Sequence, residues 1–232
     1  MLRYSFRLLL ILSCILPFQG FSQSSWLDSA ERKVVSVGFV SGVSLGAMSF
    51  LADQAVTDCM EQNQNAFWNH KAMLADHLGS KKYVIPANAL LLGTGYLLED
   101  PKLKSTSWNA LKSIASAAVV TEFLKLSLGR ARPYMEKGVF HFRSFHKNTN
   151  HFKSLPSGHT SLAFAFFTPF AESYSRWLYI FPASVAISRV YQDDHWSSDV
   201  LFGALNGFLA GYFFQHKDRN IEVTLNSVII KF

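Results

Sequence analysis

The segment SRVYQDDHWSSD (188–199) joins two strongly apolar stretches and contains a histidine and a carboxylate at helical spacing. His195 and Asp199 lie four positions apart, so on a helix they share one face and the carboxylate can accept the Nδ1–H of the imidazole. That contact leaves Nε2 with a free lone pair, and a histidine held in this way can act as a nucleophile. Arg189 adds a cation just before the pair. The alternative is an HxxxD pair on a solvated helix surface, which is common.

The segment KLSLGRARP (125–133) offers two cations that a helix would place on one side. Lys125 and Arg132 lie seven positions apart, which is two helical turns and roughly 10 Å along the axis. Pro133 then ends the helix. The pair could hold an anion, although taken alone it is better explained as a solvated basic face.

The segment PSGHT (156–160) stands directly before an apolar run and has the residues of a helix start. The backbone amides of Ser157, Gly158 and His159 would point out of the helix end, where the helix dipole favours an anion. Gly158 has no side chain to keep a phosphate oxygen away from the backbone, and His159 could give or take a proton there. In isolation the segment is equally an N-cap followed by a surface histidine.

Together the segments form the pattern K-x6-R-P, P-S-G-H and S-R-x5-H-x3-D, which is far less common by chance than any one of its parts. The pattern resembles the type 2 phosphatidic acid phosphatase superfamily, which also contains bacterial class A acid phosphatases and vanadium-dependent haloperoxidases. The resemblance covers about residues 84–212. It implies that His195 attacks phosphorus, that Asp199 orients His195, and that His159 protonates the leaving oxygen. It also implies a set of ligands for the phosphoryl oxygens: Lys125, Arg132, Ser157, Gly158 and Arg189.

On this basis we expect a metal-independent phosphatase that hydrolyses a phosphate monoester or pyrophosphate of a lipid, through a phosphohistidine intermediate in the cell envelope. We expect no metal and no cofactor, because cations and helix amides supply the charge that Mg²⁺ would. The remaining histidines lack a ligand pattern such as HExxH. Two alternatives stay open: a soluble periplasmic acid phosphatase of broad specificity, and a vanadate-dependent haloperoxidase, against which the short chain argues. A non-catalytic membrane scaffold has no use for the complete pattern.

Apolar segments that must position these residues recur along the chain and read as helices rather than as alternating strands. We therefore predict an all-α fold, a bundle of about six hydrophobic helices that is membrane-embedded or membrane-associated. The three patterns each adjoin a helix terminus, which places the active site at one end of an up-and-down bundle. The apolar segments lie at about 34–52, 84–98, 108–128, 158–175, 177–190 and 200–215.

The 232 residues allow one domain with a substantial core, and 16% charged residues are few for a soluble protein. Residues 1–22 have the layout of a secretory signal peptide, with two arginines, an apolar stretch and small residues at a cleavage point. We then expect an N-terminal helix and polar connecting region (23–83), a phosphatase helical core (84–215) and a C-terminal tail (216–232), in which residues 221–232 alternate like a strand.

The formal net charge of +6 is consistent with basic residues that bind phosphate or that contact an anionic membrane surface. Expected partners are a phosphorylated lipid or small-molecule phosphate and the membrane, without nucleic acid. The expected location is the bacterial inner membrane with an outward-facing active site, or the periplasm. Segments of about 15 residues reach only ~22 Å as helices, short of a ~30 Å hydrocarbon core, so the number of true spans stays open.

Overall fold

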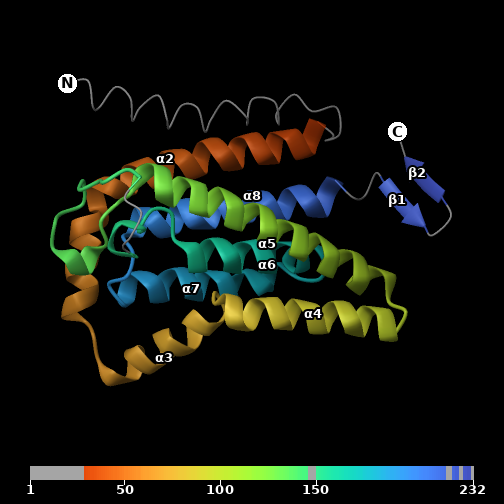
Figure 1. Ribbon diagram of the computed structural model, residues 1–232, viewed down its shortest axis with the longest axis horizontal. Helices are drawn as coiled ribbons and strands as arrows, with labels where there is room; N and C mark the ends of the chain where they lie inside the picture. The colour runs from red at the N-terminus through yellow and green to blue at the C-terminus, as the bar shows by residue number, and fades with distance from the viewer. Residues whose placement is uncertain (1–28, 146–149, 218–220, 225–226, 231–232) are drawn as a thin grey trace.

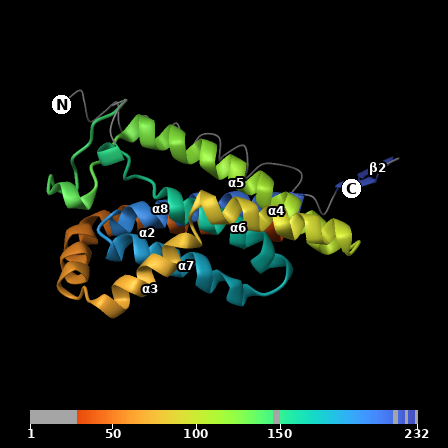
Figure 2. The same cartoon turned by 60° about the horizontal axis from the view of Figure 1, so that its bottom comes forward.

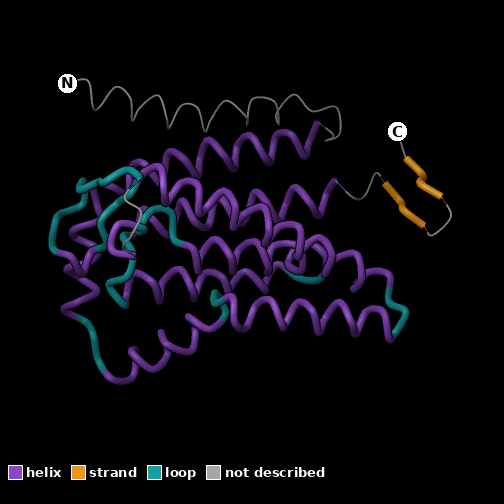
Figure 3. Tube along the Cα trace, viewed as in Figure 1, coloured by secondary structure: helices purple, strands orange, loops and turns teal. Residues whose placement is uncertain are grey.

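The computed structural model of the protein describes residues 29–145, 150–217, 221–224 and 227–230, and the predicted signal peptide (1–22) lies outside them. Most of the described chain is helical (Figure 1, Figure 3), which confirms the predicted all-α class. Short 3-10 turns cover Pro133–Met135, Asn150–Phe152 and Arg176–Tyr179. The α-helices and the strands of a C-terminal hairpin are α2 (Ser29–Gln62), α3 (Ala66–His77), α4 (Lys81–Leu97), α5 (Pro101–Leu128), α6 (Gly158–Ser173), α7 (Ile180–Tyr191), α8 (Ser197–Lys217), β1 (Ile221–Thr224) and β2 (Ser227–Ile230).

The long helices run side by side along the long axis of the molecule, and the long loop between α5 and α6 lies at one end (Figure 1). The second half of α2 turns across this same end. Helix α3 follows and lies against α7 (Figure 2). Seven α-helices fall within the described residues, against about six predicted. The difference arises because the stretch 53–83, predicted to be mainly a polar connection, contains the end of α2 and all of α3.

Local signals in the sequence explain where α5 begins and ends. Asp100 is its N-cap, and the Asp100 carboxylate accepts hydrogen bonds from the amides of Lys102 and Leu103. Pro101 follows at a position where a missing N–H costs nothing. Gly129 ends the helix with a φ of 61°, a left-handed conformation in which a side chain would also collide with the backbone of Arg143. The chain therefore turns sharply inside the segment 125–133. The prediction that Lys125 and Arg132 share one helix face and that Pro133 ends the helix is wrong, because α5 ends at Leu128 and Arg132 lies beyond it.

Helices α6 and α8 form the closest pair in the bundle, and glycines of α8 permit their approach. A Cβ atom at Gly203 would lie 2.6 Å from the carbonyl oxygen of Ser157, and one at Gly207 would overlap the carbonyl oxygen of Ser161. The two helices therefore meet at backbone distance, as small residues four apart allow. This contact fixes the start of α6 against the first turns of α8.

The bundle buries an apolar core between α4, α5 and α6, in which Val84, Ala110, Ile114 and Phe166 are buried. Large apolar side chains also remain exposed on the outer helix faces, among them Leu51, Leu97, Val119, Phe123, Trp177 and Ile187. Within the described residues, one helix is long and apolar enough to cross a membrane, over Ser36–Gln62 of α2. The C-terminal tail forms an antiparallel hairpin in which Ile221 pairs with Ile230.

Candidate active site

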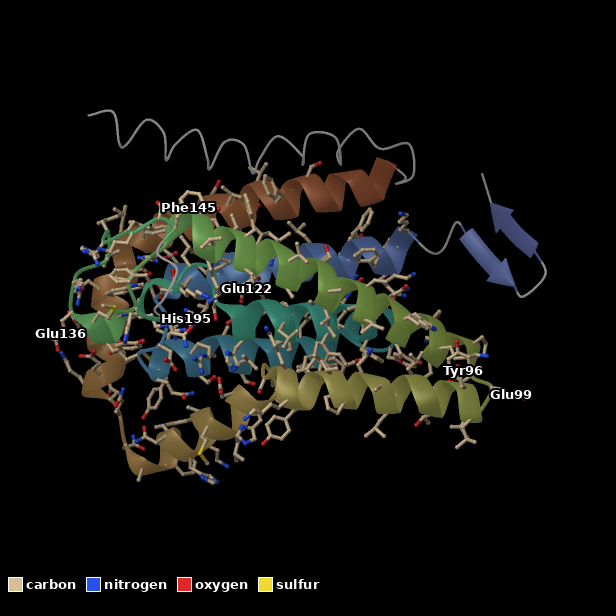
Figure 4. All side chains as sticks on the ribbon, in the orientation of Figure 1. Tyr96, Glu99, Glu122, Glu136, Phe145 and His195 are labelled. Atoms are coloured by element: carbon tan, nitrogen blue, oxygen red, sulfur yellow. The ribbon has the colours of Figure 1, made fainter. Side chains whose placement is uncertain are left out.

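The predicted site residues come together at one end of the bundle, because the C-termini of α5 and α7 and the N-termini of α6 and α8 all lie there. Figure 4 shows His195 at this end, with Tyr96 and Glu99 at the other. Each predicted residue stands at a helix terminus or in an adjoining loop: Lys125 near the end of α5, Arg132 after it, Ser157, Gly158 and His159 at the start of α6, Arg189 near the end of α7, and His195 and Asp199 at the start of α8.

His195 lies in the turn before α8, and its side chain is 1% exposed. Its Nδ1 is 3.7 Å from Oδ2 of Asp199 and 3.4 Å from Oγ of Ser154. Ser154 in turn donates to the same Asp199 oxygen at 2.5 Å. The predicted contact between His195 and Asp199 is therefore longer than a hydrogen bond here, with the Ser154 hydroxyl closer to the ring. Both oxygens face Nδ1, an arrangement that favours a proton on Nδ1 and a free lone pair on Nε2.

The charges around His195 favour its neutral form. Burial lowers the pKa of His195 to about 3, against an opposing contribution from Asp199. The charges of Lys125 and Arg132 act in the same direction as burial. Burial also disfavours the ionised form of Asp199, but the Arg130 charge and the contact with His195 outweigh it and lower the pKa of this carboxyl. A neutral imidazole beside an ionised carboxylate is the state that attack by a histidine nitrogen requires.

Arg130 connects this pair to α2. Its guanidinium donates to Asp199 Oδ1 at 2.6 Å and to Asp53 Oδ2 at 2.7 Å, and the side chains of all three residues are 0% exposed. Asp53 also accepts hydrogen bonds from the hydroxyl of Ser197 at 2.6 Å and the amide of Ser198 at 2.8 Å. A carboxylate of α2 thus satisfies donors at the start of α8 and one arginine at once. We call Asp53, Arg130 and Asp199 the buried charge chain.

Lys125 lies beside the start of α6. Its Nζ donates to the backbone carbonyl of Lys153 at 2.6 Å and lies 3.8 Å from the position that a Cβ would take at Gly158. Burial, reinforced by the charge of Arg132, lowers the pKa of Lys125 to about 8. The lysine therefore stays mainly charged at neutral pH, and its charge faces the first residue of α6.

The start of α6 offers fewer free amides than predicted. Ser157 is the N-cap, as expected, but its N–H donates to the backbone carbonyl of Asp199 at 2.9 Å. This amide therefore holds α6 to α8 and does not point out to a ligand, contrary to the expectation for Ser157. Gly158 and His159 are the first two residues of the helix, where amides have no intrahelical acceptor. The anion-binding capacity of this helix end rests on these two amides.

Two carboxylates contact the remaining cations of the site. Asp194 pairs with Nη1 of Arg132 at 3.2 Å and with Nη2 of Arg189 at 2.7 Å. Asp76 of α3 pairs with Nη1 of Arg189 at 2.5 Å and lies 3.8 Å from Nε2 of His159. Burial and the Arg189 charge lower the pKa of His159, and Asp76 opposes them. The cations predicted to hold phosphate are therefore already paired with protein oxygens.

Five residues of the site occupy no fixed position of the three sequence patterns: Asp53, Asp76, Arg130, Ser154 and Asp194. Arg130 stands two positions before Arg132, so its separate role is not visible from charge alone. The sequence did contain a signal for Asp53, because an aspartate that directly follows the apolar run 34–52 needs a partner if it is buried. No feature of the sequence indicated a role for Asp76, because the weak apolar periodicity of residues 66–77 does not predict a helix there.

Trp196 and Asp193, two further residues of the segment 188–199, lie in different surroundings. Trp196 is buried, and its Nε1 donates to the carbonyl of Ala131 at 2.9 Å, which agrees with a packing role. Asp193, the neighbour of Asp194, has no ion pair with either site arginine in the described part of the chain. Burial and the negative charge of Glu61 raise the pKa of Asp193 to about 6. The adjacent aspartates therefore have different surroundings.

The fold and the site together define an all-α protein of the phosphatase type. Comparison with known proteins gives the family. Residues 106–221, half of the chain, match the model of the PAP2 superfamily, and the chain belongs to this superfamily. The predicted resemblance to type 2 phosphatidic acid phosphatases is confirmed.

Curated relatives of the chain are lipid A 1-phosphatases. The chain is 33% identical to that of Rhizobium johnstonii over 100 residues, which cover 41% of this chain and 41% of that protein. It is 33% identical to that of Porphyromonas gingivalis over 132 residues, which cover 54% of this chain and 26% of that protein. The matches thus span less than half the length of these relatives.

Two solved structures share the fold. The crystal structure of Aquifex aeolicus LpxE aligns with a TM-score of 0.55 at 19% identity, covering 70% of this chain and 94% of that chain. A transmembrane PAP2 type phosphatidylglycerolphosphate phosphatase from Bacillus subtilis aligns with a TM-score of 0.57 at 21% identity, covering 81% and 97%. At these identities the likeness shows a common fold, a helical bundle also found in a transmembrane phosphatase.

Proposed function

We propose that the chain is a phosphatase of the cell envelope that hydrolyses the phosphate monoester or pyrophosphate of a lipid through a phosphohistidine on His195. The observation that carries this proposal is a buried imidazole beside the buried charge chain, at the point where three cations and the start of α6 meet. Because curated relatives act as lipid A 1-phosphatases, a lipid-borne sugar 1-phosphate is the first substrate to test.

The geometry supports a two-step mechanism. Nε2 of His195 attacks phosphorus, the bond between phosphorus and the lipid oxygen breaks, and His159 transfers its proton to that oxygen. Water then attacks the phosphohistidine, His159 takes the proton of this water, and inorganic phosphate leaves. The site cations and the amides of Gly158 and His159 stabilise the charge on the equatorial oxygens during both steps.

The outer surface of the bundle supports a lipid substrate and a membrane location. Exposed apolar side chains cover the helices away from the site, and α2 is long enough to cross a bilayer. The phosphate of a lipid could then reach the polar end of the bundle while its apolar part remains beside the helices. We expect the protein to stay with membranes after alkaline carbonate washing, and full release into the soluble fraction would contradict this placement.

The function is tested with purified protein and a substrate panel that contains a lipid A 1-phosphate, phosphatidic acid and a nucleotide, each assayed with a metal chelator present. We expect phosphate release from a lipid substrate and a loss of about 10⁴-fold or more in His195→Ala. His70→Ala changes an exposed histidine of α3 and is the control. Retained turnover in His195→Ala contradicts the mechanism, and equal turnover of the nucleotide favours a phosphatase of broad specificity.

A further inference from the structure

Asp194 contacts two of the cations proposed to hold the phosphoryl group. Its two carboxylate oxygens pair separately with Arg132 at 3.2 Å and Arg189 at 2.7 Å, and its backbone carbonyl also accepts from Arg132 at 3.1 Å. Carboxylate and phosphate oxygens bind the guanidinium fork in the same geometry. A phosphoryl group held by these arginines therefore uses donors that Asp194 already occupies.

The surroundings of Asp194 and Arg189 show which of them can yield. The Arg189 side chain is 7% exposed and is also paired with Asp76, so its position is fixed from two sides. Its Nε is a buried donor that has no hydrogen-bond partner in the described part of the chain, which is a free position for a phosphate oxygen. The Asp194 side chain is 29% exposed, so it has solvent on one side and can leave the arginines when an anion arrives.

We propose that Asp194 is an internal competitor for the phosphate subsite, whose carboxylate occupies Arg132 and Arg189 in the substrate-free protein and competes with the incoming phosphoryl group. The inference rests on the proposed phosphatase function. Competition from an internal carboxylate weakens the binding of every phosphate by the same factor. A lipid phosphate also gains binding from its apolar part, so it keeps a usable affinity in spite of this competition. The residue thereby lowers the affinity for the phosphoryl group and promotes release of the inorganic phosphate product.

Asp193 provides a matched control in the adjacent position. It has the same charge and belongs to the same turn, but it pairs with neither arginine. Asp193→Asn therefore removes one negative charge from this end of the bundle without freeing a guanidinium. Slightly alkaline buffer keeps Asp193 ionised, because its pKa is raised only to about 6. Any effect that comes from the general electrostatic field will be shared by the two variants.

The test measures binding of inorganic phosphate by calorimetry to purified wild-type protein, Asp194→Asn and Asp193→Asn. We expect Asp194→Asn to bind phosphate about tenfold more tightly than the wild type, because a like charge is removed from the ligand position, and Asp193→Asn to stay within about twofold. Equal or weaker binding by Asp194→Asn overturns the proposal and makes Asp194 a support for the arginines. An equal gain in both variants also overturns it.

Turnover supplies a second measurement with matched head groups. The values of kcat/KM for a lipid A 1-phosphate and for glucose 1-phosphate should both rise about tenfold in Asp194→Asn, in step with the change in phosphate binding, and inhibition by inorganic phosphate should become stronger. Unchanged or lower values of kcat/KM for both compounds contradict the proposal. Calorimetry needs no turnover, so a wild-type protein that binds phosphate but hydrolyses neither compound refutes the proposed function while the binding comparison still decides the role of Asp194.

Discussion

Residues 125–199 and residues 53–83 meet at the same end of the bundle and contribute different kinds of group. The first stretch supplies the histidines and cations that would touch a phosphoryl group. The second supplies Asp53 and Asp76, each of which contacts an arginine of the first stretch, Arg130 or Arg189. Chemistry is therefore concentrated in one stretch and its electrostatic support is spread over another. Substitutions in the two stretches should differ in how much activity and how much stability they remove.

After the loss of His195, the largest expected effect falls on activity and also belongs to the first stretch. His159→Ala removes the proposed proton donor and should lower kcat for a lipid phosphate by about 10²–10⁴-fold. The His159 side chain is 36% exposed, so we expect the melting temperature to stay close to that of the wild type. Phosphate-release kinetics and thermal unfolding on the same preparation check both statements. A His159→Ala variant with a clearly lower melting temperature, or one that keeps full activity, contradicts the assignment of chemistry to the first stretch and of stability to the second.

Asp53→Ala tests the second stretch through stability. It leaves Arg130 with one buried partner and removes the acceptor of Ser197 and Ser198, so we expect a loss of about 3–5 kcal/mol in the free energy of unfolding. Asp58→Ala removes an exposed carboxylate of the same helix and should change this free energy by about 0.5 kcal/mol or less. Tryptophan fluorescence during thermal or denaturant unfolding measures the difference. Equal free energies of unfolding for the two variants would show that the buried charge chain does not stabilise the fold.

Asp76→Asn should have a smaller and more selective effect. Asp76 opposes the burial and the Arg189 charge that lower the pKa of His159, so its loss leaves His159 protonated only at lower pH. We expect kcat for a sugar 1-phosphate to fall about tenfold, with its alkaline limb moved to lower pH. Hydrolysis of p-nitrophenyl phosphate, whose leaving group needs no proton, should fall less. Glu99→Gln at the opposite end of the bundle is the control (Figure 4), and an equal loss with both substrates contradicts the role.

The smallest effect is the pH dependence of stability that His195 contributes. Its pKa in the folded protein, about 3, lies below the ordinary value of 6.5, so the contribution is complete above pH 6.5 and is lost as pH falls toward 3. Between about pH 6 and pH 5 the wild type should lose about 1 kcal/mol more than His195→Asn. The pKa of His159 is also lowered, but it is common to both proteins. Unfolding curves at the two pH values that lose stability in parallel would contradict the burial of a neutral His195.

The apolar segments allowed the helical class to be predicted, and the three patterns allowed the end of the bundle and eight candidate site residues to be predicted, because spacing along a helix and at its termini is a local property. Contacts between distant segments were not accessible in this way. The pairing of Asp53 with Arg130 joins positions 77 apart in the chain, and that of Asp76 with Arg189 joins positions 113 apart. The Ser157 amide was misjudged for the same reason, since its acceptor is a carbonyl of another helix.

The close contact between α6 and α8 has a consequence for motion. The Gly203 and Gly207 positions bring the two backbones together, and the Ser157 amide bonds directly to the Asp199 carbonyl. The separation between the nucleophile and the start of α6 is therefore set by main-chain atoms, which cannot change rotamer. We therefore expect these two helices to move together, so that an opening that admits a bulky lipid head group comes from other elements at this end of the bundle, such as α3.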